Sequence, residues 1–229
     1  MNRILIVDDD KDIVAALEIY LTTSGYEVIS AGNGRDALAK LTQEGADLIL
    51  MDVMMPQMDG IQATRRIREH SNVPILFLTA KSEDVDLING LNVGADDYIT
   101  KPFKPMEVLA RVKSHLRRYT QLGGQHRSDS SVIEVGPIAL DDTAKRVTVD
   151  GEQVNLTPLE YSILRLLMQH PGQVFPTAQI YEQVWNDPVL GSENTVAVHI
   201  RHLREKIEID PAHPRYLKVV WGLGYKMEA

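Results

Sequence analysis

Three carboxylates follow two short apolar segments of this chain. Asp8 and Asp9 come directly after Ile4–Val7, and Asp52 ends the run Leu48–Met51. Such short runs read as strands buried on both faces, and parallel strands end at one edge of a sheet, where open α/β sheets place their ligands. Carboxylates a few ångströms apart repel by several kcal/mol unless a cation or a proton neutralises them. Oxygen ligands without a nearby Cys or His favour Mg²⁺, which leaves positions for phosphoryl oxygens.

A hydroxyl and an ammonium follow two further apolar segments. Thr79 comes after Pro74–Leu78, and Lys101 comes after Tyr98–Thr100 and before Pro102, a position where we expect a cis peptide bond. These groups suit a phosphoryl group on Asp52, with Mg²⁺ on one oxygen, Lys101 on the second and Thr79 on the third. The sequence therefore predicts phosphoryl transfer to an aspartate.

Each of these residues also has a purely structural interpretation. A lone carboxylate such as Asp52 is often a helix cap or a loop hydrogen-bond acceptor. Thr79 is equally suited to close a strand, and Tyr98 to lie half-buried on a sheet. Their combination at successive strand ends favours the functional interpretation.

The first half of the chain must fold so that these strand ends meet. Apolar residues at helical spacing and stop signals alternate with the apolar runs, which predicts a doubly wound sheet of five parallel strands. The strand order 2-1-3-4-5 of flavodoxin-like folds would bring Asp8 and Asp9 beside Asp52. The expected helices span residues 12–23, 34–41, 59–67, 83–93 and 104–118.

The second half follows a polar stretch with glycines and serines, residues 120–131, which predicts a flexible tether. Short alternating segments and the turn signal Asp150-Gly151 predict a small antiparallel sheet. Thr157-Pro158-Leu159-Glu160 has the signature of a capping box that opens a helix. Two more helices and two β-rich arms around Gly222 complete a winged helix-turn-helix pattern.

These motifs resemble the OmpR/PhoB family of two-component response regulators. Asp8-Asp9, Asp52, Thr79, Tyr98 and Lys101-Pro102-Phe103 match the family's receiver domain, with a flavodoxin-like (CheY-like) fold, and Asn194 to Arg204 and Gly222-Leu223-Gly224-Tyr225 match its α+β winged-helix effector domain. The resemblance implies a receiver over residues 1–119, a linker over 120–131 and a DNA-binding domain over 132–229. Val220-Trp221-Gly222 and Arg117-Arg118-Tyr119 look closest to the glycopeptide-resistance (VanR-like) branch.

The resemblance implies roles for the acidic site. Asp52 would accept a phosphoryl group from a phosphohistidine of a sensor histidine kinase, in a transfer that the chain itself catalyses. Mg²⁺ would be held by Asp9, Asp52 and the backbone carbonyl of Met54, with Asp8 acting through a water. Thr79 would move toward the phosphoryl group and Tyr98 would rotate inward, and this change would drive homodimerisation.

The resemblance also implies a dimer interface, stitched by ion pairs. Its matching residues are Asp96, Asp97, Glu107, Arg111 and Arg118. Leu87 stands where the family usually has the basic partner of the glutamate, which weakens one pair between subunits.

DNA contacts are expected from the third helix of the second half and from the terminal hairpin. Ala197, Val198 and Arg201 would face base edges, Asn194 on the same arc is a further DNA contact, and Arg204 and Lys218 would bind phosphates. His199 and His202 are expected to be packed or to face phosphates. Trp221 replaces the arginine of related wings and is expected to pack on the sugar-phosphate backbone. Two subunits would bind direct repeats in promoter DNA, with RNA polymerase as a further partner.

Composition and charge limit the classes of protein that remain. The chain has 229 residues, no cysteine and a net charge of −8, which exclude disulfides and argue against indiscriminate nucleic-acid binding. Residues 194–226 nevertheless carry six basic and three acidic side chains. The chain enters its first strand at once and lacks an apolar run of about 20 residues, so we expect a cytoplasmic protein without a signal peptide or membrane contact.

Two alternatives to a phosphorylation-dependent transcriptional regulator stay open at this point. A Mg²⁺-dependent phosphohydrolase with an aspartyl nucleophile needs a second acid two residues after that nucleophile, where this chain has Met54. A DNA-binding protein with a degenerate receiver would lack some of the acidic and basic site residues, all of which are present. We therefore expect a regulator that is not an enzyme beyond its own phosphorylation and dephosphorylation.

Overall fold

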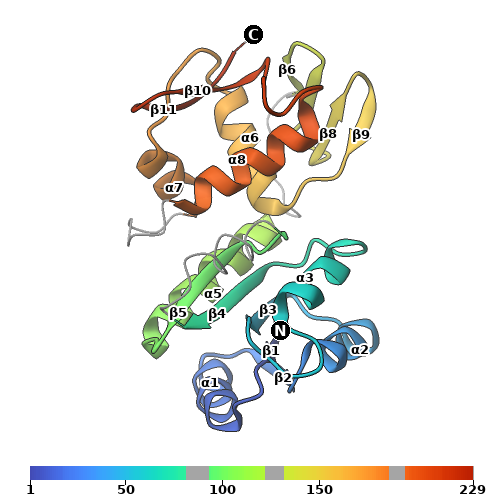
Figure 1. The fold of residues 1–229 in the computed structure, drawn as a ribbon, viewed down its shortest axis with the longest axis vertical. Helices are drawn as coiled ribbons and strands as arrows, with labels where there is room; N and C mark the ends of the chain where they lie inside the picture. The colour runs from blue at the N-terminus through green and yellow to red at the C-terminus, as the bar shows by residue number, and fades with distance from the viewer. Residues whose placement is uncertain (81–92, 122–131, 186–193, 229) are drawn as a thin grey trace. The chain divides into compact units, whose positions relative to one another are not determined.

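The computed structural model describes residues 1–80, 93–121, 132–185 and 194–228 (Figure 1). The side chains of residues 118–121 and 194 are outside this description. Contacts divide the chain into two compact units, Met1–Tyr119 and Thr120–Ala229. The expected helix 83–93, except for its last residue, and most of the tether 120–131 also lie outside the described residues.

The first unit contains a five-stranded sheet with the order β2-β1-β3-β4-β5, and every neighbouring pair is parallel. This order confirms the flavodoxin-like fold. The strands are β1 (Arg3–Val7), β2 (Glu27–Ala31), β3 (Leu48–Asp52), β4 (Ile75–Ala80) and β5 (Asp97–Lys101).

Helices cover both faces of this sheet. On one face, Ile4, Leu50 and Leu76 of the strands pack with residues of α1 and α5 in one buried cluster. The described helices are α1 (Lys11–Thr23), α2 (Gly34–Glu44), α3 (Gly60–Arg68) and α5 (Pro105–Gln121). Because both faces are covered, all five residues of β3 are buried, as the uninterrupted apolar run predicts.

The second unit combines an antiparallel sheet, three helices and a hairpin. The four-stranded sheet has the order β6-β7-β8-β9, and the hairpin pairs β10 with β11. Asp150 and Gly151 form the expected turn between β8 and β9, with φ angles of 51° and 85°. The elements are β6 (Val132–Val135), β7 (Ile138–Asp141), β8 (Arg146–Val149), β9 (Glu152–Val154), α6 (Pro158–Met168), α7 (Thr177–Trp185), α8 (Asn194–Ile207), β10 (Leu217–Val220) and β11 (Gly224–Met227).

The three helices of this unit share one core with the sheet and the hairpin. Ile163 of α6, Ile200 of α8 and Leu217 of β10 belong to the same buried cluster. The capping box at Thr157 and Glu160 is formed as predicted. The arrangement agrees with a winged helix-turn-helix, so both parts of the expected fold class are confirmed. Within the described ranges, no helix combines the length and the apolar composition needed to cross a membrane.

Candidate functional site

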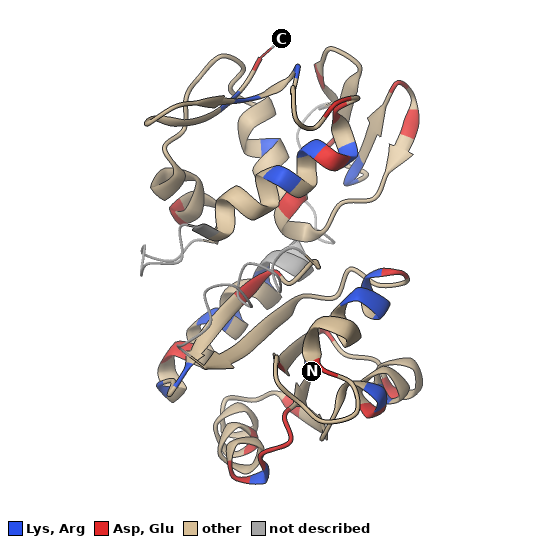
Figure 2. Ribbon diagram, viewed as in Figure 1, with Lys and Arg blue, Asp and Glu red and all other residues tan. Residues whose placement is uncertain are grey.

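The three predicted carboxylates meet at the carboxyl edge of the receiver sheet. Because Val7 of β1 pairs with Met51 of β3, the residues that follow them lie side by side. Asp8, Asp9 and Asp52 each offer an oxygen, and these atoms lie within 4.8 Å of one another. Asp8 and Asp52 are 2% and 8% exposed, whereas Asp9 is exposed. Figure 2 shows the acidic segment after β1 in red.

Lys101 supplies the cation of this site. Its ammonium lies 2.7 Å from Asp8 Oδ2 and 2.9 Å from Asp52 Oδ2. Burial raises the pKa of Asp52, and although Lys101 opposes that shift, the pKa stays above its ordinary value. Burial by itself would lower the pKa of Lys101, but its two carboxylate partners raise it. The site thus holds more carboxylates than ammonium groups.

Of the three consecutive aspartates after β1, only Asp8 and Asp9 contribute to the acidic site. The next residue, Asp10, is the N-cap of α1, so its carboxylate accepts hydrogen bonds from backbone N–H groups at the start of that helix. The N–H of Asp10 donates to Asp8 Oδ1 at 2.9 Å. A Cβ on Gly60 would lie 2.1 Å from the carbonyl oxygen of Asp52, so only glycine lets α3 begin so close to the site.

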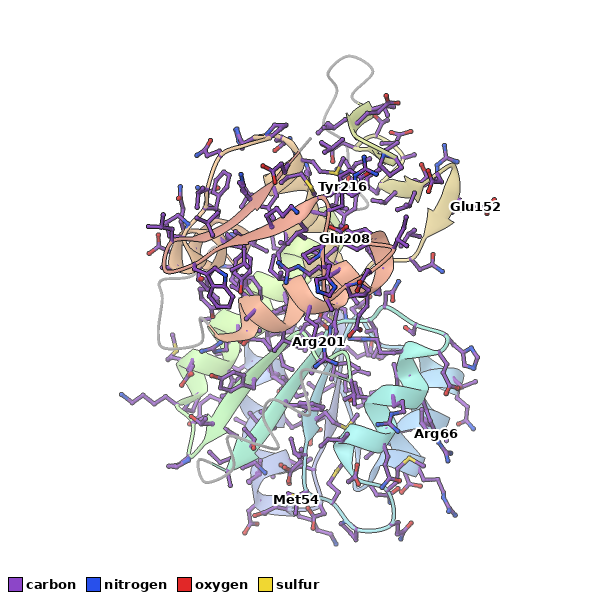
Figure 3. All side chains as sticks on the ribbon, turned by 45° about the horizontal axis from the view of Figure 1, so that its top comes forward. Met54, Arg66, Glu152, Arg201, Glu208 and Tyr216 are labelled. Carbon is purple, nitrogen blue, oxygen red and sulfur yellow. The ribbon has the colours of Figure 1, made fainter. Side chains whose placement is uncertain are left out.

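The donor set fits a hard divalent cation. All three groups offer oxygen, and one ammonium cannot neutralise three carboxylates. Asp8 and Asp9 also line an open hollow of about 340 Å³ between the start of α1 and the end of β2. The N–H of Met54 lies 3.3 Å from Asp52 Oδ1, and its side chain, labelled in Figure 3, is 64% exposed. The site is therefore open to solvent on this side.

Thr79 and Tyr98 lie on the two strands beyond β3. The Thr79 side chain is 5% exposed, and its hydroxyl is 3.4 Å from the carbonyl oxygen of Ala80. Thr79 pairs with Thr100 and Ala80 pairs with Lys101, which brings the hydroxyl to the same sheet edge as the ammonium. Tyr98 is partly exposed. The Lys101-Pro102 peptide bond is cis, as expected.

Three of the residues expected at a dimer interface form buried ion pairs within one chain. Asp96 lies 2.8 Å from Arg68 Nη2, and Asp97 lies 2.7 Å from Arg111 Nη1. Burial by itself would raise the pKa of Asp97, but Arg111 and His115 bring it below its ordinary value. These two carboxylates and Arg111 are at most 4% exposed in the single chain, and their part in a dimer interface stays a prediction.

Two members of the expected interface set differ from the others. The Glu107 side chain is 36% exposed, and it lies 3.5 Å from Arg111 Nη2. The Arg118 side chain and Leu87 lie outside the described residues.

Helix α8 presents three of the predicted DNA-contacting residues at its surface. Ala197 and Arg201 are exposed, and Val198 is partly exposed. The Arg201 guanidinium lies 3.0 Å from Glu205 one turn further along the helix. Arg201 is labelled in Figure 3. Asn194 begins the helix, but its side chain is outside the description.

Arg204, predicted to contact a phosphate, also has partners within its own unit. Its Nε donates to the carbonyl oxygen of Leu217 at 3.0 Å, and its Nη2 is buried. Burial lowers the pKa of Arg204. This guanidinium thus ties β10 to α8, and a phosphate contact by Arg204 stays a prediction.

Glu208 is a second tie between α8 and the hairpin, and sequence reasoning missed it. Its carboxylate accepts hydrogen bonds from the N–H groups of Arg215, Tyr216 and Leu217 at 2.7, 2.8 and 2.7 Å. Glu208 and Tyr216 are labelled in Figure 3. A lone glutamate after a helix gives no sequence signal for this role, because its three donors come from a segment seven to nine residues away.

The hairpin carries the remaining predicted DNA contacts. Lys218 is partly exposed on β10, and Trp221 in the turn is 88% exposed.

A second potential metal-binding cluster lies on the buried side of α8, between α8 and α6. Ligand atoms of Glu160, His199 and His202 lie within 4.8 Å of one another, and all three residues are buried. Lys206 Nζ lies 2.6 Å from Glu160 Oε2, so an ammonium already faces this carboxylate. This geometry favours the prediction that the two histidines are packed.

Comparison with known proteins agrees with both units. Residues 4–113 match the family described as response regulator receiver domain, and residues 151–227 match transcriptional regulatory protein, C terminal. The chain is 46% identical over 228 residues to the uncharacterized transcriptional regulatory protein YrkP of Bacillus subtilis strain 168, covering 99% of this chain and 98% of YrkP. It is 40% identical over 228 residues to the regulatory protein VanR of Enterococcus faecium, covering 99% of each.

A solved structure gives the same classification. The response regulator DrrB of Thermotoga maritima, an OmpR/PhoB homolog, matches over 100% of both chains with 33% identity and a TM-score of 0.51. The chain therefore belongs to the OmpR/PhoB type of two-component response regulators, which regulate transcription in dependence on phosphorylation.

Proposed function

We propose that Asp52 accepts a phosphoryl group from a phosphohistidine of a sensor histidine kinase. The observation that carries this proposal is the meeting of Asp52, Asp8 and Lys101, with the ammonium within 2.9 Å of both carboxylates. In the transfer, a carboxylate oxygen of Asp52 attacks phosphorus, the P–N bond breaks and the imidazole of the kinase leaves. The phosphoryl group adds a charge of about −1.5 to −2. The Lys101 ammonium would then move from the Asp52 carboxylate to a phosphoryl oxygen.

Asp8, Asp9, Asp52 and the backbone carbonyl of Met54 would hold Mg²⁺. When bound, the ion offsets negative charge on the phosphoryl oxygens and supplies part of the neutralisation that Lys101 alone does not. The hollow beside Asp8 and Asp9 leaves room for its remaining water ligands. This role fits the oxygen-only donor set.

The switch is proposed to start at Thr79 and Tyr98. Within the described ranges, the Thr79 hydroxyl makes one long contact, 3.4 Å to the backbone carbonyl of Ala80, so turning toward a phosphoryl oxygen costs it little. Tyr98 on β5 would then turn inward and alter the surface of β5 and α5. A homodimer would form there, with Glu107 and Arg118 as contacts and the buried pairs of Asp96, Asp97 and Arg111 as the support beneath them.

The second unit is proposed to bind promoter DNA through α8 and the hairpin. The surface of α8 would lie in the major groove, with Asn194, Ala197, Val198 and Arg201 toward base edges and Lys218 toward a phosphate. Two copies would bind direct repeats about 10–10.5 bp apart and would act on RNA polymerase. In this scheme residues 1–119 receive the phosphoryl group, residues 120–131 tether, residues 132–229 read DNA, and the protein works in the cytoplasm.

The test is a titration of the full chain with beryllofluoride or a small phosphodonor in the presence of Mg²⁺. Wild type should gain dimer and DNA affinity, whereas Asp52→Ala should gain neither. Asp12→Asn, an exposed aspartate on α1, is the matched control and should respond as wild type does. Equal responses of wild type and Asp52→Ala would refute the assignment of Asp52.

Sustained hydrolysis of small phosphomonoesters would favour the phosphohydrolase alternative, which the family assignment does not favour.

A further inference from the structure

The turn of the β10–β11 hairpin exposes two large apolar side chains. Trp221 is 88% exposed and Leu223 is 63% exposed, whereas Leu217 and Met227 at the base of the same hairpin are 0% exposed. The apolar residues at the base of the hairpin are thus buried in the domain core. The exposed pair at the turn is therefore not part of this domain's own core.

The turn holds this pair in a fixed conformation. The N–H of Leu223 donates to the carbonyl oxygen of Val220 at 2.9 Å, which closes a four-residue turn. Gly222 stands between the two apolar residues with a φ of 73°, a value that suits glycine at the third position of a β-turn. Trp221 and Leu223 consequently flank a tight tip that has no side chain at its centre.

The base of the hairpin is tied to the rest of the unit on both strands. Glu208 and Arg204 of the α8 region bind the backbone of β10. On β11, Phe175 and Tyr225 exchange two backbone hydrogen bonds of 2.8 and 3.0 Å. These contacts fix the hairpin relative to α8. Its tip therefore projects from a base that is held in place (Figure 1).

Positive charge lies a short distance behind the tip. Lys218 and Lys226 are directly opposite each other on the two strands, and Glu228 lies 2.9 Å from Lys226. Facing like charges repel, and Glu228 offsets one of the two, so this group of three side chains keeps a net positive charge. From Lys218 to Val220, the last residue of β10, the strand advances about 7 Å at roughly 3.3 Å per residue, and Trp221 follows in the turn. That distance is comparable to the depth of the DNA minor groove, about 7.5 Å, whose rims carry phosphates.

We propose that Trp221 and Leu223 form an apolar wedge that enters the DNA minor groove and partly unstacks one base step. The inference rests on the proposed DNA binding of α8, because the groove next to the major groove that α8 occupies is a minor groove. A tip with one large side chain on each side of a glycine fits a groove about 6 Å wide, whereas the facing lysines reach the phosphates on its rims.

The wedge would give the protein sequence preference at bases that α8 does not touch. Pyrimidine–purine steps unstack and kink more readily than A-tracts. Sites with a flexible step beneath the tip should therefore bind more tightly and bend on binding.

The first experiment uses tryptophan fluorescence of the full chain. Trp185 is 1% exposed and Trp221 is 88% exposed, so acrylamide quenching reports almost entirely on Trp221, and Trp221→Phe gives the background of Trp185. The probe is a duplex with two half-sites, selected from random DNA with wild-type protein, in the presence of beryllofluoride and Mg²⁺. Binding should shield Trp221 from acrylamide, and unchanged quenching in the saturated complex would overturn the proposal.

The second experiment measures affinity and DNA bending, the latter by energy transfer between dyes at the two duplex ends. Trp221→Ala should lose about tenfold or more in affinity and should relax the bend. Ile209→Ala removes another exposed apolar side chain, 97% exposed and outside the hairpin, and should stay within about twofold of wild type. The buried Trp185 reports that both variants are folded.

Replacing the flexible step beneath the tip with an A-tract separates the wedge from a general apolar contact. The replacement should weaken wild type but leave Trp221→Ala unchanged. Equal losses in both proteins, or an effect of Trp221→Ala on self-association without DNA in place of DNA affinity, would overturn the wedge. Wild-type protein that binds no duplex would refute DNA binding itself, whereas tight binding that does not depend on Trp221 would refute only the wedge.

Discussion

Asp52 and Asp97 are two buried aspartates of one sheet with opposite electrostatic character. Each lies within 3 Å of a basic group, Lys101 for Asp52 and Arg111 for Asp97. Their pKa values nevertheless move in opposite directions, upward for Asp52 and downward for Asp97. Burial alone would raise both, so the difference comes from their neighbours.

The number of partners explains the contrast. Asp97 faces Arg111, lies 3.4 Å from His115 and accepts a hydrogen bond from the N–H of Tyr98. Among the described residues, Asp52 has one ammonium partner, Lys101, which it shares with Asp8. A carboxylate with enough donors is a fixed structural element, whereas one with too few retains repulsion that a new ligand can relieve. The same residue type thus stabilises the fold at one end of β5 (Asp97, called the strut below), whereas beside the other end it is the proposed phosphorylation switch (Asp52).

The largest predicted effect is the loss of the strut. Asp97→Asn would remove the nearer of the two carboxylates beside the buried Arg111 guanidinium and leave the more exposed Glu107 at 3.5 Å, and breaking a buried pair costs about 3–5 kcal/mol. Both tryptophans lie in the second unit, so urea unfolding of the receiver should be followed by hydrogen exchange of its amides. Asp12→Asn should remain within about 0.5 kcal/mol of wild type. A similarly small change in Asp97→Asn would show that the pair is not a stabilising element.

Glu208 extends the contrast to the second unit, because it is a carboxylate satisfied by backbone N–H groups alone. Glu208→Gln keeps the shape but removes the charge that three hydrogen bonds share, which should destabilise this unit by about 2 kcal/mol. Tryptophan fluorescence during urea unfolding measures the change. Glu205→Gln changes an exposed glutamate on α8, the helix that ends just before Glu208. It should have a much smaller effect, and equal effects would contradict the anchoring role.

Sequence reasoning identified the residues of the proposed phosphorylation site better than the buried charged residues that stabilise each unit. Asp8, Asp9, Asp52 and Lys101 each follow a separate apolar run, and parallel topology alone brings such strand ends together. The strand order and the capping box at Thr157 follow from equally local signals. These features were therefore predictable from spacing.

The buried charged residues depend on contacts between distant segments, which sequence spacing does not reveal. Arg204 has the position of a phosphate contact on α8, but it packs against a strand thirteen residues later. The burial of Asp97 likewise depends on how α5 packs on β5. A charged residue beside the apolar face of a helix gives the same sequence pattern whether its side chain faces solvent or packs against another segment of the chain.

The pH dependence of stability sharpens the comparison. Since the folded pKa of Asp97 is lowered, its ionised form contributes stability at pH values above its unfolded pKa of about 3.9. That contribution is lost as the pH falls through the lower folded pKa, by up to about 1.4 kcal/mol per pH unit. The gap in unfolding free energy between wild type and Asp97→Asn should therefore stay constant near neutral pH and narrow below about pH 4. A gap that is independent of pH down to the acid transition would contradict the assignment.

The smallest expected effect has the opposite sign and belongs to the switch. Asp52→Asn removes one of three neighbouring carboxylates, while its amide oxygen still accepts a hydrogen bond from Lys101. In a buffer with a chelator, relief of the repulsion from Asp8 should stabilise the receiver by on the order of 1 kcal/mol. Mg²⁺ should stabilise wild type more than Asp52→Asn, because the variant has lost an anionic ligand, so the added ion should close or reverse the difference. Hydrogen exchange of the receiver with and without Mg²⁺ measures both effects. If Asp52→Asn were as destabilising as Asp97→Asn, the two aspartates would be equivalent struts, and the proposed division between switch and strut would fail.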